Sequence, residues 1–363
     1  MIKVPPPSDK LQVIDLVRTF SILSVLAYHM YGATKPGPPF DWLWKSFSGN
    51  GVYGVFVFFV VSGFLITRLI DGKKSQLFTP RFKEFYVRRA ARILPLLILH
   101  ISIGAYIVHN VTHFEPLFWV SILTFTFNWY QALHPNPVPG LYWGLLWSLA
   151  VEEQFYLFYP MVLKSLGAAR RLVYFGAGII LFGIFWRGTF LFFPAEHEIF
   201  FYKTSFGAFD QIAMGALLYL ASKRYRNSLL AHKNISAWLC AGGGLIVAGA
   251  YLFTDSNLQL DNSYSPTLVA LGAFFFILGG LHLPFFESNY WTALTWPGKY
   301  SYGIYLFHSL IYFFVYPRLL QGQNTLVAFF LFAAIATAIM ALSYRLFEMP
   351  TNHLVRKLFG VKT

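Results

Sequence analysis

The feature that most constrains this chain is its first hydrophobic stretch, residues 11–33, which is long enough to cross a bilayer and yet contains ionisable side chains. Asp15, Arg18 and His29 all lie within it. Such residues are costly at membrane depth, so they indicate a functional site by default. Arg18 and His29 are eleven residues apart. In an α-helix this spacing puts them about 20° apart on one face and about 16 Å apart in depth.

Asp15 precedes Arg18 by three residues and can pair with it on the helix surface. The functional interpretation is a fixed cation at one depth and a proton acceptor at another. A structural interpretation stays open for this helix alone: a buried ion pair and a histidine that only packs.

The composition makes the whole chain a membrane protein. Hydrophobic residues account for 56% of the 363 residues and charged residues for 12%, whereas soluble proteins have about 25% charged residues. We therefore expect an all-α polytopic integral membrane protein of about ten transmembrane helices. The predicted spans are 11–31, 51–70, 93–110, 143–163, 172–193, 204–222, 236–254, 266–284, 300–317 and 324–345.

The basic residues predict the topology, because Lys and Arg concentrate in cytoplasmic connections. Segment 68–92 holds eight basic and two acidic residues, a net charge of +6. It is therefore predicted to be cytoplasmic, as are both termini, and 118–142 is then a short re-entrant segment. We expect one membrane domain over 1–350 and a short cytoplasmic tail over 351–363. The formal charge of +13 does not indicate a nucleic-acid partner, because the basic residues cluster at span ends.

The third span begins with three arginines, Arg88, Arg89 and Arg92. Guanidinium groups suit bidentate binding of phosphate oxygens, and a helix N-terminus adds partial positive charge. Ordinary anchoring to anionic lipid is the alternative, but three arginines on one turn favour an anionic ligand. In the second span, Ser62 and Gly63 form a small spot in an aromatic wall. Close helix packing is the favoured interpretation of this spot, and a ligand pocket beside His29 is the other.

The fourth span carries Glu152 and Glu153 near mid-membrane. A buried carboxylate needs a cation or a proton-transfer role, and adjacent positions point about 100° apart, so only one can share a site with His29. Trp147 and Tyr156 are candidates to line that site. His308 in the ninth span is a further candidate, although a lone histidine often only bonds a backbone carbonyl. The spacing of the residues indicates no metal site.

Seven motifs together resemble the membrane-bound acyltransferase-3 family, the integral membrane O-acyltransferases that acetylate bacterial surface sugars. They run through nearly the whole chain: IDLVRTFSILSVLAYH (14–29), FFVVSGFLIT (58–67), RRAARILPL (88–96), WSLAVEEQFYLFYP (147–160), FDQIAMGALL (209–218), SYGIYLFH (301–308) and RLFEMP (345–350).

The resemblance implies an acyl-CoA donor, usually acetyl-CoA, a hydroxyl acceptor on a polysaccharide or its lipid-linked precursor, and a bacterial inner membrane. It also implies catalytic roles for Arg18, His29 and Glu152, and donor binding by the three arginines of the third span. Many relatives have an arginine where this chain has Ala208, which weakens any role transferred to the nearby Asp210.

Our hypothesis is that His29 acts as general base on the acceptor hydroxyl and that Glu152 orients it. Acylation of His29 itself is a second route. A different class also fits ionisable residues inside a membrane: a proton-coupled transporter using the intramembrane Asp, Glu and His residues. The basic cluster and the lack of a visible repeat argue against the transporter. The acceptor, the acyl chain length and the oligomeric state stay open.

Overall fold

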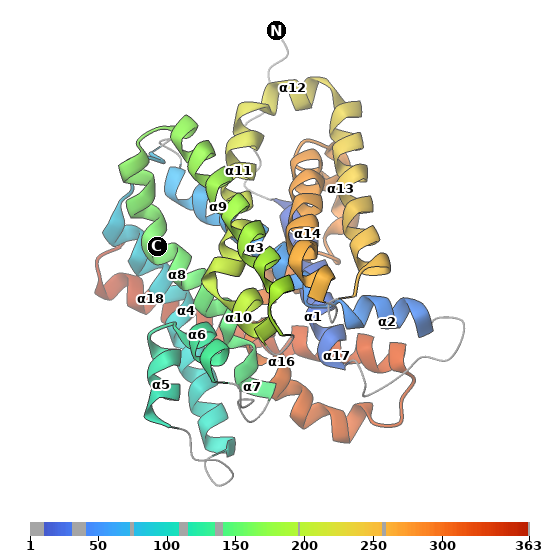
Figure 1. Ribbon diagram of the computed structural model, residues 1–363. Helices are drawn as coiled ribbons and strands as arrows, with labels where there is room; N and C mark the ends of the chain where they lie inside the picture. The colour runs from blue at the N-terminus through green and yellow to red at the C-terminus, as the bar shows by residue number, and fades with distance from the viewer. Residues whose placement is uncertain are drawn as a thin grey trace.

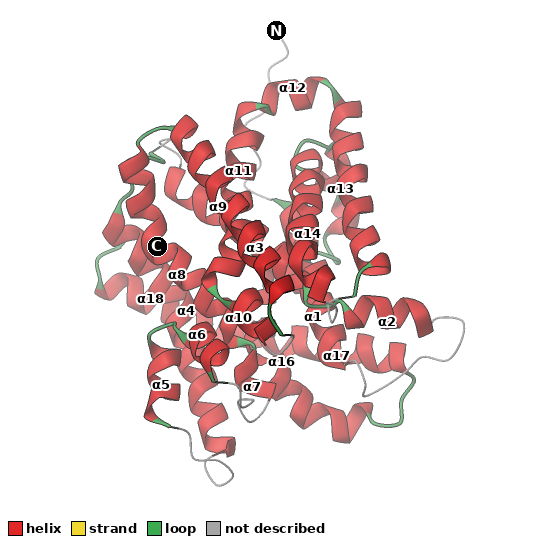
Figure 2. Cartoon of the chain, in the orientation of Figure 1, coloured by secondary structure: helices red, strands yellow, loops and turns green. Residues whose placement is uncertain are grey.

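A computed structural model describes residues 11–30, 41–72, 76–108, 115–134, 141–194, 197–255 and 259–361. Within these ranges the chain is almost entirely helical and contains no strand (Figure 2). The predicted all-α class is therefore confirmed. The sequence also predicts an outer loop at the Pro-rich stretch 134–140, which lies outside the described residues except for His134.

The helices fall into two groups by length. The long helices are α1 (Gln12–Met30), α3 (Tyr53–Asp71), α4 (Phe82–Val108), α8 (Leu146–Leu166), α9 (Ala169–Thr189), α11 (Ser205–Arg224), α13 (Lys233–Phe253), α14 (Gln259–Gly280), α16 (Ser301–Val315) and α17 (Thr325–Ser343). The short elements are α2 (Asp41–Gly49), α5 (Pro116–Leu123), α6 (Phe127–Leu133), α7 (Leu141–Gly144), η1 (Phe190–Phe192), α10 (Glu198–Lys203), α12 (Arg226–Ala231), η3 (Pro284–Glu287), η4 (Asn289–Trp291), α15 (Trp296–Lys299), η5 (Tyr316–Leu320), η6 (Tyr344–Glu348) and α18 (Met349–Leu358).

Eight helices of the described chain are long and apolar enough to cross a membrane, which confirms a polytopic membrane protein. The remaining long helices, α8 and α11, correspond to the predicted spans 143–163 and 204–222. The number of spans and the side of each terminus stay predictions. Figure 1 shows α12 at one end of the bundle and α5 and α7 towards the other. Part of the predicted tail, 351–358, lies in the helix α18, which packs against α4.

The segment predicted to re-enter is broken into α5 and α6, each far shorter than the roughly 20 residues that a span needs. The break lies at Phe125, whose φ of 55° is left-handed, a conformation that is costly for a residue other than glycine. Gln154 of α8 holds this turn, because its amide donates to the Phe125 carbonyl at 2.6 Å and to Asn128 Oδ1 at 2.8 Å. Gln154, a polar side chain in a predicted span, thus holds the non-helical backbone between α5 and α6.

Helices α3 and α11 cross where two glycines face each other. A Cβ on Gly63 would collide with the Ile212 carbonyl, and a Cβ on Gly215 would collide with the Val60 carbonyl and meet the Gly63 Cα. Small residues let helix backbones approach this closely, which is the usual way that helices associate in a bilayer. Gly63 is therefore needed for helix packing.

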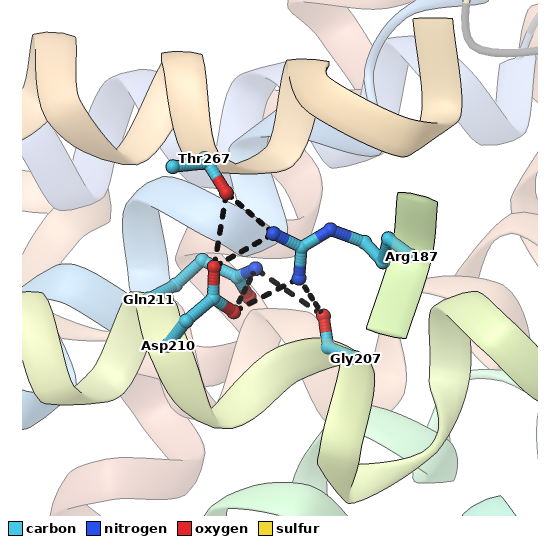
Figure 3. A network of polar contacts seen from close by, with 5 residues as sticks. All are labelled: Arg187, Gly207, Asp210, Gln211 and Thr267. Carbon is cyan, nitrogen blue, oxygen red and sulfur yellow. Dashed lines mark hydrogen bonds and ion pairs between the residues drawn. The ribbon is translucent and has the colours of Figure 1, made fainter. Parts of the chain in front are cut away.

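A buried ion pair joins α9, α11 and α14 (Figure 3). Arg187 donates to both carboxylate oxygens of Asp210, at 3.0 and 2.7 Å, and the two side chains are 1% and 0% exposed. Arg187 also donates to the Gly207 carbonyl and to Thr267, while Gln211 donates to Asp210 at 2.7 Å. Asp210 thus has an arginine partner, supplied by α9 instead of position 208, and its role is structural.

We predict that Arg187→Met lowers the stability of the protein strongly. The substitution leaves the Asp210 carboxylate buried without its cation, which typically costs about 3–5 kcal/mol. The thermal midpoint in detergent should fall, and Asp210→Leu in the same chain should recover much of the loss. Arg81→Met removes an exposed pair with Glu84 and should leave the midpoint nearly unchanged. Equal midpoints for Arg187→Met and Arg81→Met would contradict the prediction.

Candidate functional site

The long helices enclose a cavity of about 1510 Å³. Residues of α1, α3, α4, α8, α11 and α16 line it, together with Arg226 of α12. Its lining includes Arg68 and Arg81 from the segment that the charge pattern predicts to be cytoplasmic. A ligand cavity typically has about 300–1,000 Å³, so this space can hold a long molecule that enters from the predicted cytoplasmic side.

The cavity wall is strongly basic. Three carboxylates face eight cationic side chains in it, and the eight are Arg18, Arg68, Arg81, Arg88, Arg89, Arg92, Lys223 and Arg226. The carboxylates are Asp71, Glu84 and Glu152. Such an excess of one charge in a low-dielectric cleft attracts and concentrates a ligand of the opposite charge. The cavity is suited to an anion.

Arg89 is fixed in the wall by two partners. Its Nη2 donates to Glu153 Oε1 at 2.6 Å, with both side chains about 85% buried (15% and 14% exposed), and its guanidinium lies 4.0 Å from the centroid of the Tyr156 ring. Glu153 therefore has the cation that a carboxylate at this depth requires. The pair also joins α4 to α8, the two helices that bring most of the predicted site residues together.

Arg18 and Arg92 are held less tightly. Arg18 lies 3.4 Å from Asp15, as the spacing predicts, and the charges of Arg92 and Glu152 also act on it. No hydrogen bond or ion pair joins Arg92 to another residue of the described chain. Both arginines also line a second cavity of about 410 Å³, whose wall includes Lys299 and Arg356. Glu348 also lies in this wall and its charge acts on Arg92. Guanidinium groups that keep free donors can bind phosphate oxygens.

Glu152 lies in the cavity wall with hydroxyl groups around it. Its neighbours in this wall include Arg89 and the hydroxyl groups of Ser62 and Tyr156, which are bonded to each other. None of the described contacts joins Glu152 to His29, and the expectation that Glu152 orients His29 stays a prediction.

His29 lies beyond the cavity, beside His308. The two ring centroids are 4.7 Å apart, and Tyr28 flanks His29 on the other side with a ring centroid 5.3 Å away. His308 is fully buried, and its Nδ1 lies 2.6 Å from the Tyr305 carbonyl oxygen. Tyr305 itself lines the cavity, and its hydroxyl lies 2.6 Å from Ser148 Oγ. Tyr305 thus connects the cavity to the histidine pair.

Three residues predicted to line the substrate pocket, Gly63, Trp147 and His308, are not in the described wall of the large cavity. Gly63 contacts the backbone of α11, as described above, because close helix packing uses the missing side chain. Trp147 is only 5% exposed, and its ring centroid lies 5.9 Å from that of Phe59 and 6.0 Å from Lys203 Nζ. Ser62 and Tyr156 do lie in that wall.

Lys203 is a neighbour of His29 that the sequence did not reveal. It ends α10, and its charge acts on His29 and on Glu198 at the start of the same helix. Burial lowers the pKa of Lys203 and raises that of Glu198, and each charge opposes the shift of the other. The signal in the sequence that could have revealed it is a lysine that follows an aromatic run at the predicted outer end of a helix.

These features define an integral membrane protein with a large basic cavity that leads towards a histidine pair. Comparison with known proteins identifies the family. The acyltransferase-3 family, described as an acyltransferase domain, matches residues 11–345. The chain belongs to this family, which confirms the resemblance seen in the motifs.

Three bacterial relatives illustrate the similarity. The chain is 28% identical over 368 residues to the peptidoglycan O-acetyltransferase OatA of Listeria monocytogenes, covering 93% of this chain and 55% of the relative. The putative peptidoglycan O-acetyltransferase YrhL of Bacillus subtilis is also 28% identical, with 93% and 54% covered. A putative O-acetyltransferase of Staphylococcus aureus is 24% identical, with 93% and 56% covered. The chain spans about half the length of these curated relatives, and no solved structure matches it.

We predict that inorganic pyrophosphate stabilises the protein through Arg18 and Arg92. A ligand that binds only the folded state at 100 times its Kd stabilises it by about 2.7 kcal/mol. The thermal midpoint in detergent should rise with pyrophosphate, and Arg92→Ala or Arg18→Ala should reduce the rise. Arg318→Ala is the matched control, because Arg318 is exposed, bonds the Phe314 carbonyl and lies outside both described cavities. An equal rise in all four proteins would contradict the assignment.

Proposed function

We propose that this protein is a membrane O-acetyltransferase that moves an acetyl group from acetyl-CoA to a hydroxyl of a cell-surface carbohydrate. The observation that carries the proposal is the arrangement along α1. Arg18 lies in the wall of a basic cavity, and His29 lies beyond that cavity on the same helix face. An anionic donor with a long neutral arm matches this arrangement, since its phosphates and its reactive carbonyl need different surroundings.

The basic cavity would hold the donor. Coenzyme A carries several phosphate groups, and Arg88, Arg89 and Arg92 of α4 would bind them together with Arg18. Arg92 and Arg18 would make the most direct contacts, because Arg88 donates to Glu84 at 2.6 Å and Arg89 is paired with Glu153. The arm would then extend past Ser62, Tyr156 and Glu152. Their hydroxyl and carboxylate groups can hydrogen-bond the amides of such an arm.

His29 would act as the general base. It takes the proton of the acceptor hydroxyl as the oxygen attacks the thioester carbon, the carbon–sulfur bond breaks, and the coenzyme leaves as a thiolate. The proton then passes from His29 to the thiolate, so that atoms and charge balance. Glu152, in this proposal, holds the donor arm. A direct transfer of this kind needs no acyl-enzyme intermediate.

The acceptor would approach His29 from the side opposite the basic cavity. Two of the relatives named above are named as peptidoglycan O-acetyltransferases, one of them as putative, so a hydroxyl of a peptidoglycan sugar or its lipid-linked precursor is the first acceptor to test. Tyr28 is 41% exposed and offers an aromatic face beside His29, which suits a sugar ring. The membrane would then be the inner membrane of a bacterium, with the donor on its cytoplasmic side.

We predict that His29→Ala abolishes acetyl transfer while the donor still binds. Membranes with wild-type protein should move radiolabel from acetyl-CoA into envelope carbohydrate. Loss of a general base typically costs about 10²–10⁴-fold in rate, and the loss should fall on kcat. Arg92→Ala should instead raise the KM for acetyl-CoA, because it removes a phosphate contact. His232→Ala, an exposed residue of the loop after α12, should behave as wild type.

Normal transfer by His29→Ala would overturn its role as base. A wild-type protein that binds acetyl-CoA without consuming it would overturn the enzymatic proposal itself and favour a carrier. If Arg92→Ala and His29→Ala changed the KM for acetyl-CoA equally, the two residues would not have separate roles.

A further inference from the structure

We propose that His308 is a positioning residue for His29: the lone pair on its Nε2 accepts a hydrogen bond from the His29 ring and holds His29 with its other nitrogen towards the acceptor hydroxyl. The inference rests on the proposed function, because it assigns a partner to the base of that reaction. It gives His29 a neutral histidine in the place where other His-based sites have a carboxylate.

The hydrogen-bonding pattern of His308 carries the argument. Its Nδ1 lies 2.6 Å from the Tyr305 carbonyl oxygen. A carbonyl can only accept, so Nδ1 carries the hydrogen, and Nε2 of the neutral ring is left with a lone pair. That Nε2 is buried and has no partner among the described residues. A buried polar atom without a partner costs about 1–3 kcal/mol, so it indicates a contact that forms with a moving group or a ligand.

The surroundings make His29 the group that can satisfy this atom. The two ring centroids are 4.7 Å apart and their planes are inclined by 48°, so a small side-chain rotation changes a ring contact into a nitrogen–nitrogen contact. The other neighbours of His308 fit less well, because the Tyr305 hydroxyl is already bonded to Ser148 and to the Leu145 carbonyl. No hydrogen bond or ion pair of the described chain joins either ring to a carboxylate.

The position of His308 also explains how the donor reaches the base. Tyr305 belongs to the wall of the large cavity, and its backbone carbonyl fixes His308. The residue that the donor arm would contact therefore sets the orientation of the ring that faces His29. During transfer the proton from the acceptor would be held on the His29 nitrogen that faces the acceptor until the thiolate takes it. The N–H on the opposite His29 nitrogen would stay hydrogen-bonded to His308 Nε2 throughout, so one proton is moved and none is left over.

Two amide variants separate this role from simple packing. A glutamine amide reaches the position of Nε2, whereas an asparagine amide reaches that of Nδ1 and keeps only the bond to Tyr305. We predict that His308→Asn lowers kcat about 100-fold, as a misplaced catalytic group does, with the KM for acetyl-CoA changed less than about twofold. His308→Gln should keep at least about ten times the kcat of His308→Asn, because an acceptor remains at the ε position.

His232→Asn is the matched control. His232 also places its Nδ1 against a backbone carbonyl, that of Ser228 at 3.0 Å, but it is exposed and remote from the histidine pair. Each rate is divided by the amount of folded protein, measured by pyrophosphate binding. A higher kcat for His308→Asn than for His308→Gln, or equal kcat values, would overturn the inference while leaving the proposed function intact. A wild-type protein without transfer would overturn both.

Discussion

The pairing of charges inside the bilayer is the constraint on which the rest of this structure depends. Every charge at membrane depth must find a partner or face a water-accessible cavity. The chain uses both solutions, and the choice decides what each residue can do. Arg187 and Asp210 are paired with each other and join three helices, whereas Arg92 makes no hydrogen bond or ion pair in the described chain and faces the cavity. The Arg187–Asp210 pair stabilises the helix bundle, whereas a residue such as Arg92 is available to bind a ligand.

The same constraint explains the mixed wall of the cavity. Arg89 is paired with Glu153, and this ion pair aligns α4 with α8, so that Arg92 and Glu152 lie in one wall of the cavity. If only unpaired arginines lined the cavity, their guanidinium groups would repel one another strongly in this low-dielectric environment. The paired Arg89 therefore helps to place the unpaired Arg92 in the wall, and a bound anion can neutralise the excess of positive charge. The basic cavity is therefore an outcome of helix packing as much as of composition.

Much of the fold could be predicted from the sequence, because its signals are local. Helix length, apolar runs and positions of arginines fixed the all-α membrane class and the cluster at the start of α4. The depth offset of Arg18 and His29 follows from helix geometry alone.

What could not be predicted depends on contacts between distant segments. The partner of Asp210 is Arg187, 23 residues earlier, and that of Glu153 is Arg89, 64 residues earlier. Gly63 illustrates the same limit, since a small residue in a span has the same local pattern whether it faces a ligand or, as here, another helix. The neighbours of Glu152 in the cavity wall likewise come from other helices, Ser62 from α3 and Arg89 from α4, and no local pattern encodes which helices meet.

The histidine pair shows why a neutral partner suits this depth. A carboxylate beside His29 would itself need a cation, and the described cation that acts on His29 is Lys203, a half-buried lysine that already interacts with Glu198. An imidazole costs far less to bury, because it needs only hydrogen bonds, and the Tyr305 carbonyl supplies one of them. The chain can thus keep its strong charges near the cavity, where a phosphate-bearing ligand can compensate them. The depth of His29 and His308 is then left to groups that exchange a proton without a lasting charge. Separation of charge binding from proton transfer along one helix is then a consequence of the bilayer, since no single depth is suited to both.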